Sequence, residues 1–123
     1  MNPGPELDAL VAERVMGWER WWVTSNGWRW RDAGKLLAWE KDWRPSADIA
    51  AAWKVVERMI GLDYVVVLTG LVDWNCRFEE DFDIADYPRR GPMFGEADEA
   101  TAPMAICIAA LQAAAAAGGK SNG

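Results

Sequence analysis

The chain has 123 residues, of which 51% are hydrophobic and 26% charged, as is typical of a single globular domain. Its formal net charge of −6 argues against binding to duplex DNA or to an anionic membrane, because both require a positive field. Nine tryptophans and no histidine are present, so the commonest proton shuttle and metal ligand is missing. Since tryptophan supplies a flat apolar ring for burial or stacking, the composition favours binding over catalysis, without a metal or cofactor.

Residues 1–117 are predicted to form one domain, and the Gly-, Lys- and Ser-containing residues 118–123 a disordered tail. Cys76 and Cys107 lie in apolar patterns without the spacing of a metal site, which predicts buried free thiols in a reducing cytoplasm. The alanine-rich run from Ala105 to Ala117 is too short to cross a bilayer, and no signal peptide opens the chain. A soluble cytoplasmic protein is therefore expected.

The first predicted element is a helix. Apolar residues recur at helical spacing after Pro5, and Glu6 and Asp8 occupy the first turn, where the helix dipole favours anions. The pattern predicts a helix from Pro5 to Met16 that stops at Gly17.

A hairpin is predicted next, because Asn26-Gly27 lies between two segments rich in tryptophan and arginine and is typical of a two-residue type I′ turn. Such a turn pairs Ser25 with Trp28, Thr24 with Arg29, Val23 with Trp30 and Trp22 with Arg31. Because side chains alternate across a strand, this register assigns two faces. One face carries Trp21, Val23, Trp28 and Trp30, and the other carries Arg20, Trp22, Thr24, Arg29 and Arg31.

The middle of the chain alternates between strand and helix signals. Leu36–Trp39 predicts a third short strand, and an apolar stripe predicts a helix with Ser46 as its N-cap and Gly61 at its end. The apolar run in Tyr64–Thr69 is typical of a strand covered on both faces. In Val72–Phe78 apolar and polar residues alternate, which predicts one buried and one wet face.

Acidic residues, proline and glycine dominate Asp81–Ala100, which predicts a mobile, solvated connection. Pro103 then marks the first turn of a last helix. The elements follow one another as helix, hairpin, helix, hairpin and helix. This order predicts an α+β fold in which three helices pack on a mainly antiparallel sheet built from two hairpins, as a sandwich.

Three segments, Glu6–Trp18, Pro45–Glu57 and Ala100–Leu111, resemble in sequence and order the signature blocks of the phage ABA-sandwich-domain proteins. The resemblance implies a compact sandwich of helices and sheet, encoded by a viral accessory gene and present in the infected bacterial host. It carries no catalytic motif. Small phage accessory proteins often disarm bacterial immunity, sometimes by sequestering nucleotide-derived alarm signals, so the resemblance favours a binding role by analogy.

The first candidate site is the Trp28-Arg29-Trp30-Arg31 strand together with Trp22 and Arg44. An exposed indole can stack on a base, and arginine pairs bidentately with phosphate. In the alternative interpretation Trp21, Trp28 and Trp30 belong to the core and Arg31 lies over Trp22 as a cation–π pair.

Two weaker candidates remain. The helix N-terminus near Ser46, with Arg44 beside it, can hold an anion, or it is simply capped by Ser46. Arg89 and Arg90, in a loop bounded by proline and glycine, can close over an anion as a lid, or they are only solvated. The acids between Glu79 and Asp86 lack the spacing of a calcium loop.

These features lead to a first hypothesis: a non-enzymatic phage counter-defence protein that sequesters a small nucleotide-type signal, such as a cyclic dinucleotide or an ADP-ribose derivative. A homo-oligomer with sites between subunits is expected. The alternative is an inhibitor or adaptor that binds a host defence protein through a tryptophan patch, with acids steering it toward a basic partner. A third interpretation is a structural or housekeeping component of the phage without a small ligand.

Overall fold

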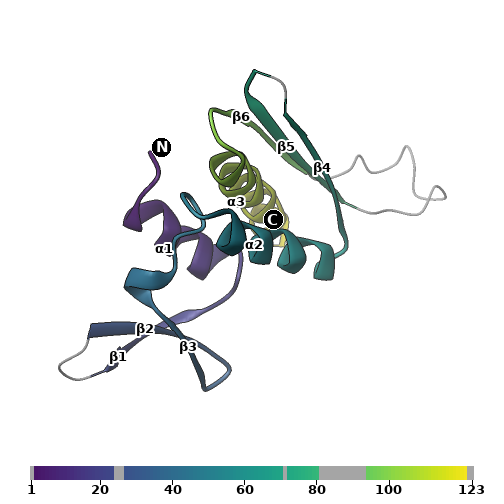
Figure 1. Cartoon of the computed structure of the whole chain (residues 1–123). Coiled ribbons are helices and arrows are strands. Elements are labelled where there is room, and N and C mark those ends of the chain that lie inside the picture. The colour runs from purple at the N-terminus through teal and green to yellow at the C-terminus, as the bar shows by residue number, and fades with distance from the viewer. Residues whose placement is uncertain (1, 24–26, 71, 81–93, 122–123) are drawn as a thin grey trace.

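The computed structural model describes residues 2–23, 27–70, 72–80 and 94–121. Three helices and six strands alternate along the chain, and the predicted α+β class is confirmed (Figure 1). In chain order the elements are α1 (Pro5–Arg14), β1 (Glu19–Val23), β2 (Gly27–Asp32), β3 (Lys35–Trp39), the 3-10 turn η1 (Glu40–Asp42), α2 (Ile49–Gly61), β4 (Tyr64–Gly70), β5 (Trp74–Glu80), β6 (Phe94–Glu99) and α3 (Ala102–Ser121).

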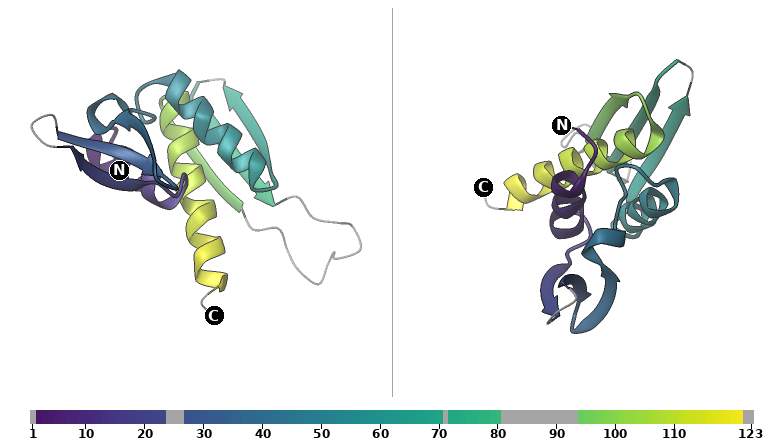
Figure 2. Two further views of the ribbon diagram at one scale, coloured as in Figure 1. Left: turned by 90° about the horizontal axis from the view of Figure 1, so that it is seen from below. Right: turned by 60° about the vertical axis from the view of Figure 1, so that its left-hand side comes forward.

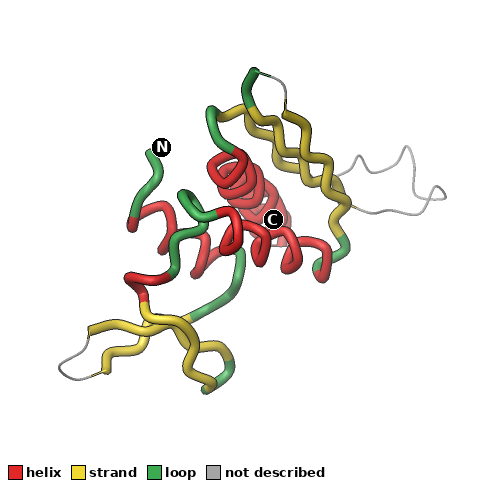
Figure 3. Tube along the Cα trace, viewed as in Figure 1, coloured by secondary structure: helices red, strands yellow, loops and turns green. Residues whose placement is uncertain are grey.

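The strands form two separate antiparallel sheets, β1-β2-β3 and β4-β5-β6, where the sequence predicted one. The three helices lie between the two sheets (Figures 1 and 2). The division into red helices and two yellow sheets is followed most easily along the chain trace (Figure 3). The described part of the chain therefore has a layered, sandwich-like arrangement.

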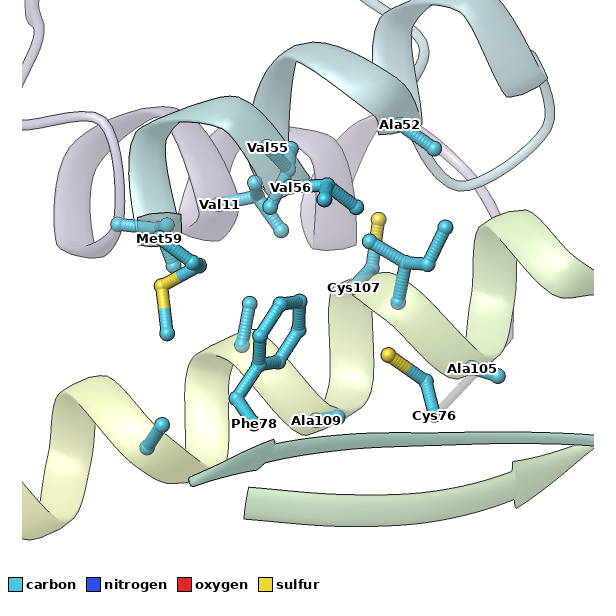
Figure 4. Packing of buried hydrophobic residues seen from close by; sticks show 14 of the residues in the cluster. Val11, Ala52, Val55, Val56, Met59, Cys76, Phe78, Ala105, Cys107 and Ala109 are labelled. Carbon is cyan, nitrogen blue, oxygen red and sulfur yellow. The ribbon is translucent and has the colours of Figure 1, made fainter. Parts of the chain in front are cut away.

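Helix α3 is the centre of the core. It contacts β5 and β6 on one side and α1 and α2 on the other. Its buried residues include Ile106, Cys107 and several alanines, so it is apolar around most of its circumference, as expected of a helix covered on all sides. Val56 from α2 and Phe78 from β5 point into the same space as Cys107 (Figure 4).

Strand β6 lies unusually close to α3 because it has no side chain at Gly95. A Cβ atom placed there would stand 1.9 Å from the backbone oxygen of Ala109 and 2.7 Å from the nitrogen of Ala113. Ala105, Ala109 and Ala113 are four residues apart, so they form one small-residue ridge facing this strand. The sheet and helix backbones can therefore approach closely.

Both cysteines are buried free thiols, as the sequence predicted. Cys76 from β5 and Cys107 from α3 point toward the same part of the core (Figure 4). Burial raises the pKa of the Cys76 thiol from 9.0 to about 12. Burial, with smaller effects from Asp8 and Cys76, also raises the pKa of Cys107. Both side chains therefore act as small apolar groups and not as nucleophiles.

The predicted register of the first hairpin is wrong. Val23 pairs with Gly27 and Trp22 with Trp28, so three residues and not two connect the strands. Residues 24–26 themselves lie outside the described part of the chain. The pairing is displaced by an odd number of residues, which exchanges the faces of β1 relative to β2. One face now carries Arg20, Trp22, Trp28 and Trp30, and the other carries Glu19, Trp21, Arg29 and Arg31.

The second half of the chain brings further corrections. Strand β4 is not covered on both faces, because Val65 and Val67 on its outer face are each 46% exposed. In the following segment Cys76 and Phe78 are buried as predicted, but Val72 and Trp74 are exposed.

The segment that was predicted as a connection contains strand β6, since Phe94–Glu99 pairs with β5. Pairing with a neighbouring strand overrides its acidic, glycine-containing composition, which is unfavourable for a strand. At the two ends of the chain, α1 stops at Arg14, two residues before the predicted boundary, and the backbone of α3 is helical to Ser121, past Ala117.

Candidate ligand-binding pocket

An open pocket of about 710 Å³ lies where the start of α1 meets the β1-β2-β3 sheet. Its volume falls within the range of about 300–1,000 Å³ that is usual for small-molecule sites. The lining comes from four parts of the chain: the residues around the start of α1, the first residues of β2, the end of β3 with η1, and the segment that leads to α2. These residues are Pro3, Gly4, Pro5, Asp8, Gly27, Trp28, Trp39, Glu40, Lys41, Trp43, Arg44, Ser46 and Ala47.

One side of the pocket is held by a buried hydrogen-bond network. The backbone N–H of Ser46 donates to Oδ1 of Asp8 at 2.8 Å, and the N–H of Gly4 donates to Oγ of Ser46 at 3.0 Å. The indole N–H of Trp43 donates to the backbone oxygen of Asp8 at 3.1 Å. Because these bonds join residues about forty positions apart, they fix the start of α1 against the segment before α2.

This network shows that the prediction of Ser46 as the N-cap of α2 is wrong. Helix α2 begins at Ile49, and its N-cap is Asp48, whose Oδ1 accepts from the N–H of Ala50 at 3.2 Å. Ser46 is buried, and both its N–H and its hydroxyl oxygen are engaged by the α1 region. Its amide is therefore not free to hold an anion at this helix end.

Three tryptophans line the pocket, and each one has a partner that fixes its position. Arg20 lies over the ring of Trp28 at 4.3 Å, and Arg29 lies over the ring of Trp39 at 5.1 Å. The ring of Trp43 packs at 4.6 Å on that of Trp18. Walls that are held in place before a ligand arrives reduce the entropy lost on binding.

The charges around the pocket leave two cations without an acidic partner. Arg20 binds the Glu40 carboxylate through Nε at 2.9 Å and through Nη2, so this acid is neutralised. Lys41 and Arg44 are exposed and form no ion pair among the residues that the structure describes. Arg20 is not part of the lining, but if it is counted with the lining, three cations (Arg20, Lys41 and Arg44) stand against two acids (Asp8 and Glu40). The pocket and its surroundings then carry a net charge of +1, although the whole chain is acidic.

The structure brings together only part of the predicted site. Trp28, Arg44 and Ser46 all line the pocket. Trp22 does not line it, but its ring contacts that of Trp28 at 5.1 Å. Arg89 and Arg90 lie outside the described residues, so the predicted lid stays a prediction.

The other two predicted arginines are used within the sheet. Arg29 donates from Nε to the backbone oxygen of Leu37 at 2.8 Å, and its guanidinium group lies over the ring of Trp39. Arg31 binds Glu19 at 2.8 Å and lies 3.8 Å over Trp21, not over Trp22 as the alternative interpretation had it. The corrected register explains this change, because it places Arg31 and Trp21 on the same face.

The prediction from sequence missed Trp39, Lys41 and Trp43, as well as the start of α1. A local signal for the first three existed, since two tryptophans and two cations alternate within Trp39–Arg44. This segment is less dense than the four consecutive Trp and Arg residues of β2, but it includes Arg44, which was already a candidate. The contribution of Pro3–Asp8 depends on tertiary packing and has no local signal.

The fold is that of a small α+β sandwich with an open pocket at one end of its helical layer. The chain belongs to the phage ABA sandwich domain family, whose sequence pattern matches residues 9–111. No curated protein and no solved structure matches the chain. The matched region includes Trp28, Lys41 and Arg44, whereas Gly4 and Asp8 precede it. Among the described helices, none combines the length and the apolar character that crossing a membrane requires.

Proposed function

We propose that this protein is a phage counter-defence protein that sequesters a small nucleotide-type signal without cleaving it. The observation that carries the proposal is the pocket, in which three indole rings with fixed partners meet two cations, Lys41 and Arg44, that form no ion pair with any residue in the described ranges. Stacking on an indole contributes about 1–3 kcal/mol per base, and cations next to the rings suit a phosphate. Membership in a phage family supports the counter-defence role by analogy.

A role in binding, without chemistry, is supported by the groups that line the pocket. The chain contains no histidine, and the buried Ser46 hydroxyl already accepts a hydrogen bond from Gly4. The Asp8 carboxylate accepts the backbone N–H of Ser46, so one of its two oxygens already has a structural partner. Trp28 and Trp39 would contact the base, and Lys41 and Arg44 the phosphate.

Thermal denaturation of the purified protein with a panel of cyclic dinucleotides and ADP-ribose derivatives tests the proposal. A ligand present at about a hundred times its dissociation constant adds roughly 2.7 kcal/mol to the free energy of unfolding. The ligand should be recovered intact after incubation, because no cleavage is proposed. If no nucleotide in the panel stabilises the protein, the proposal is wrong.

Two pairs of variants locate the site. Trp28→Ala and Arg44→Ala should each weaken binding of the active nucleotide by about tenfold or more, because each removes a stacking or charged contact. Trp53→Ala and Lys54→Ala, on α2 and outside the pocket lining, are the matched controls and should leave the affinity unchanged. Equal losses in both pairs would exclude this pocket as the binding site.

The second candidate function, binding to a host defence protein, is favoured by a different surface. On the face of β1 and β2 opposite to Trp22 and Trp28, Trp21 is 45% exposed and Arg31 lies over its ring. Exposed tryptophan and arginine are the residues that most often dominate the energy of protein interfaces. Capture of one host protein that is lost with Trp21→Ala, in a protein that binds no nucleotide, would favour this function.

A further inference from the structure

One edge of strand β4 lacks the usual sequence protection against pairing with another strand. The strand pairs with β5 over all seven residues without a shift in register, and no other described strand pairs with its opposite edge. Natural proteins protect such edges with charged residues, proline or a β-bulge. The sequence of β4, Tyr-Val-Val-Val-Leu-Thr-Gly, contains no charge and no proline, and its ladder with β5 contains no bulge.

Apolar side chains surround this edge. On the outer face of the sheet Val65 and Val67 are exposed. Helix α2 contacts β4 and lies alongside it (Figure 2). Ile49, Trp53 and Ile60 are about half exposed and lie in one stripe of α2, because their spacings of four and seven residues bring them to the same face.

The direction in which this stripe points can be inferred from a contact on the opposite face of α2. There, Arg58 donates from Nε to the backbone oxygen of Val15, which turns that face toward the end of α1. The stripe of Ile49, Trp53 and Ile60 is therefore turned away from α1 and toward the β4 side of the molecule. The stripe lies on the helix side of this edge, and Val65 and Val67 lie on its outer side. We call the edge of β4 together with these apolar residues the β4 edge surface.

We propose that the β4 edge surface binds a second copy of this chain through antiparallel pairing of the two β4 strands. Val67 is the middle residue of the seven, so a two-fold axis that pairs the whole strand passes beside it. Pairing about this axis places Val65 of one copy opposite Thr69 of the other and joins the two sheets into one. The strand is compatible with itself, because this two-fold pairing brings no like charges together.

Geometry and charge both favour a second copy as the partner. The two-fold axis of an antiparallel strand pair is perpendicular to the sheet, so both α2 helices lie on the same side of the joined sheet, with the exposed Ile49, Trp53 and Ile60 of each copy turned toward the pairing edge. Two chains that each carry a charge of −6 repel one another, and such repulsion is least where the contact surface is uncharged. This inference is independent of the proposed nucleotide binding.

Light scattering coupled to size-exclusion chromatography tests the proposal with the unmodified chain and two variants. The unmodified protein should elute as a dimer at about 100 µM, a concentration at which even a dimer with a dissociation constant of about 1 µM is largely formed. Val67→Lys should be monomeric, because it places two lysines opposite each other at the axis. Leu36→Lys, which changes an exposed apolar residue on β3, is the matched control and should remain dimeric.

Cross-linking provides a second measurement that does not depend on weakening the fold. Cys76 and Cys107 are buried, so Val67→Cys introduces a single accessible thiol on each copy. A short bis-maleimide should then join two chains in high yield, whereas Leu36→Cys should give little cross-linked product. A monomeric unmodified protein, a dimeric Val67→Lys variant or the failure of Val67→Cys to cross-link would overturn the proposed pairing.

Discussion

Single residues determine how the layers of this protein meet, and Gly95 is the clearest example. The backbone of β6 approaches that of α3 at this point because glycine lacks a Cβ atom. Ala105, Ala109 and Ala113 of α3 have only a methyl group as side chain, so no large side chain separates this helix from β6. The contact therefore depends on the absence of side-chain atoms as much as on the burial of apolar ones.

Gly95→Ala should consequently destabilise the protein strongly. The new methyl group would overlap the backbone oxygen of Ala109, and no side-chain rotation can relieve a contact between backbone atoms. We expect a loss of about 3 kcal/mol or more in the free energy of unfolding, at the upper end of overpacking effects. The change can be measured by urea denaturation.

Gly61→Ala is the matched control, because a Cβ atom at Gly61 meets no atom within 4 Å. It lies at the end of α2 and should be neutral or stabilising by about 0.5 kcal/mol, since alanine is the better helix former. A Gly95→Ala protein as stable as the control would contradict the close packing described for α3 and β6.

At the level of elements, the start of α2 shows how a local rule can select the wrong residue. Ser46 and Asp48 are both good N-cap residues, and the sequence alone does not distinguish them. Ser46 is instead taken up by Gly4 and Asp8 of the distant α1 region. The helix therefore begins later, after Asp48.

Asp48→Ala should lower the free energy of unfolding by about 1 kcal/mol, because it leaves the N–H of Ala50 without its acceptor. Asp48→Ser should retain most of that stability, since serine also caps helices well. Both values come from thermal or urea denaturation of the two variants. A serine variant as unstable as the alanine variant would show that Asp48 does not act as the cap.

The first hairpin shows what the sequence could and could not predict. Its existence and its strands followed from the Asn26-Gly27 signal and from the aromatic segments on either side. The register did not, because connections of two and of three residues are both compatible with a glycine at positive φ, and Gly27 has a φ of 100°. This one ambiguity reversed the face of Trp21 and Trp22 and so changed which arginines could reach the site.

For the whole molecule, the class of fold and most elements could be predicted, whereas the number of sheets and the location of the pocket could not. Periodicity reports which face of an element is apolar, but not which element covers it. The pocket joins Gly4 and Asp8 to Trp28 and Trp43, and such contacts between distant residues leave no local pattern. Arg44, a candidate from the sequence because it lies beside the start of the second predicted helix, is one of the residues that line the pocket.

The two sheets should differ in stability. In the β1-β2-β3 sheet Trp30 is the only described residue that is fully buried, whereas β5 contributes Cys76 and Phe78 to a core shared with α3. Regions with few buried apolar contacts open locally without global unfolding. Amide hydrogen exchange should therefore show protection factors at least about tenfold lower in β1–β3 than in β5 and α3. Equal protection in both sheets would indicate one cooperative unit.

The attachment of the chain's beginning to the pocket has a practical consequence. Pro3 and Gly4 are part of the pocket lining, and Gly4 is tied to Ser46. A purification tag fused ahead of Met1 would thus be tethered beside the opening, where it can compete with small molecules and give false negatives in screening. The C-terminal end of helix α3 lies away from the β1-β2-β3 sheet (Figure 2). A tag is therefore better fused to the C-terminus.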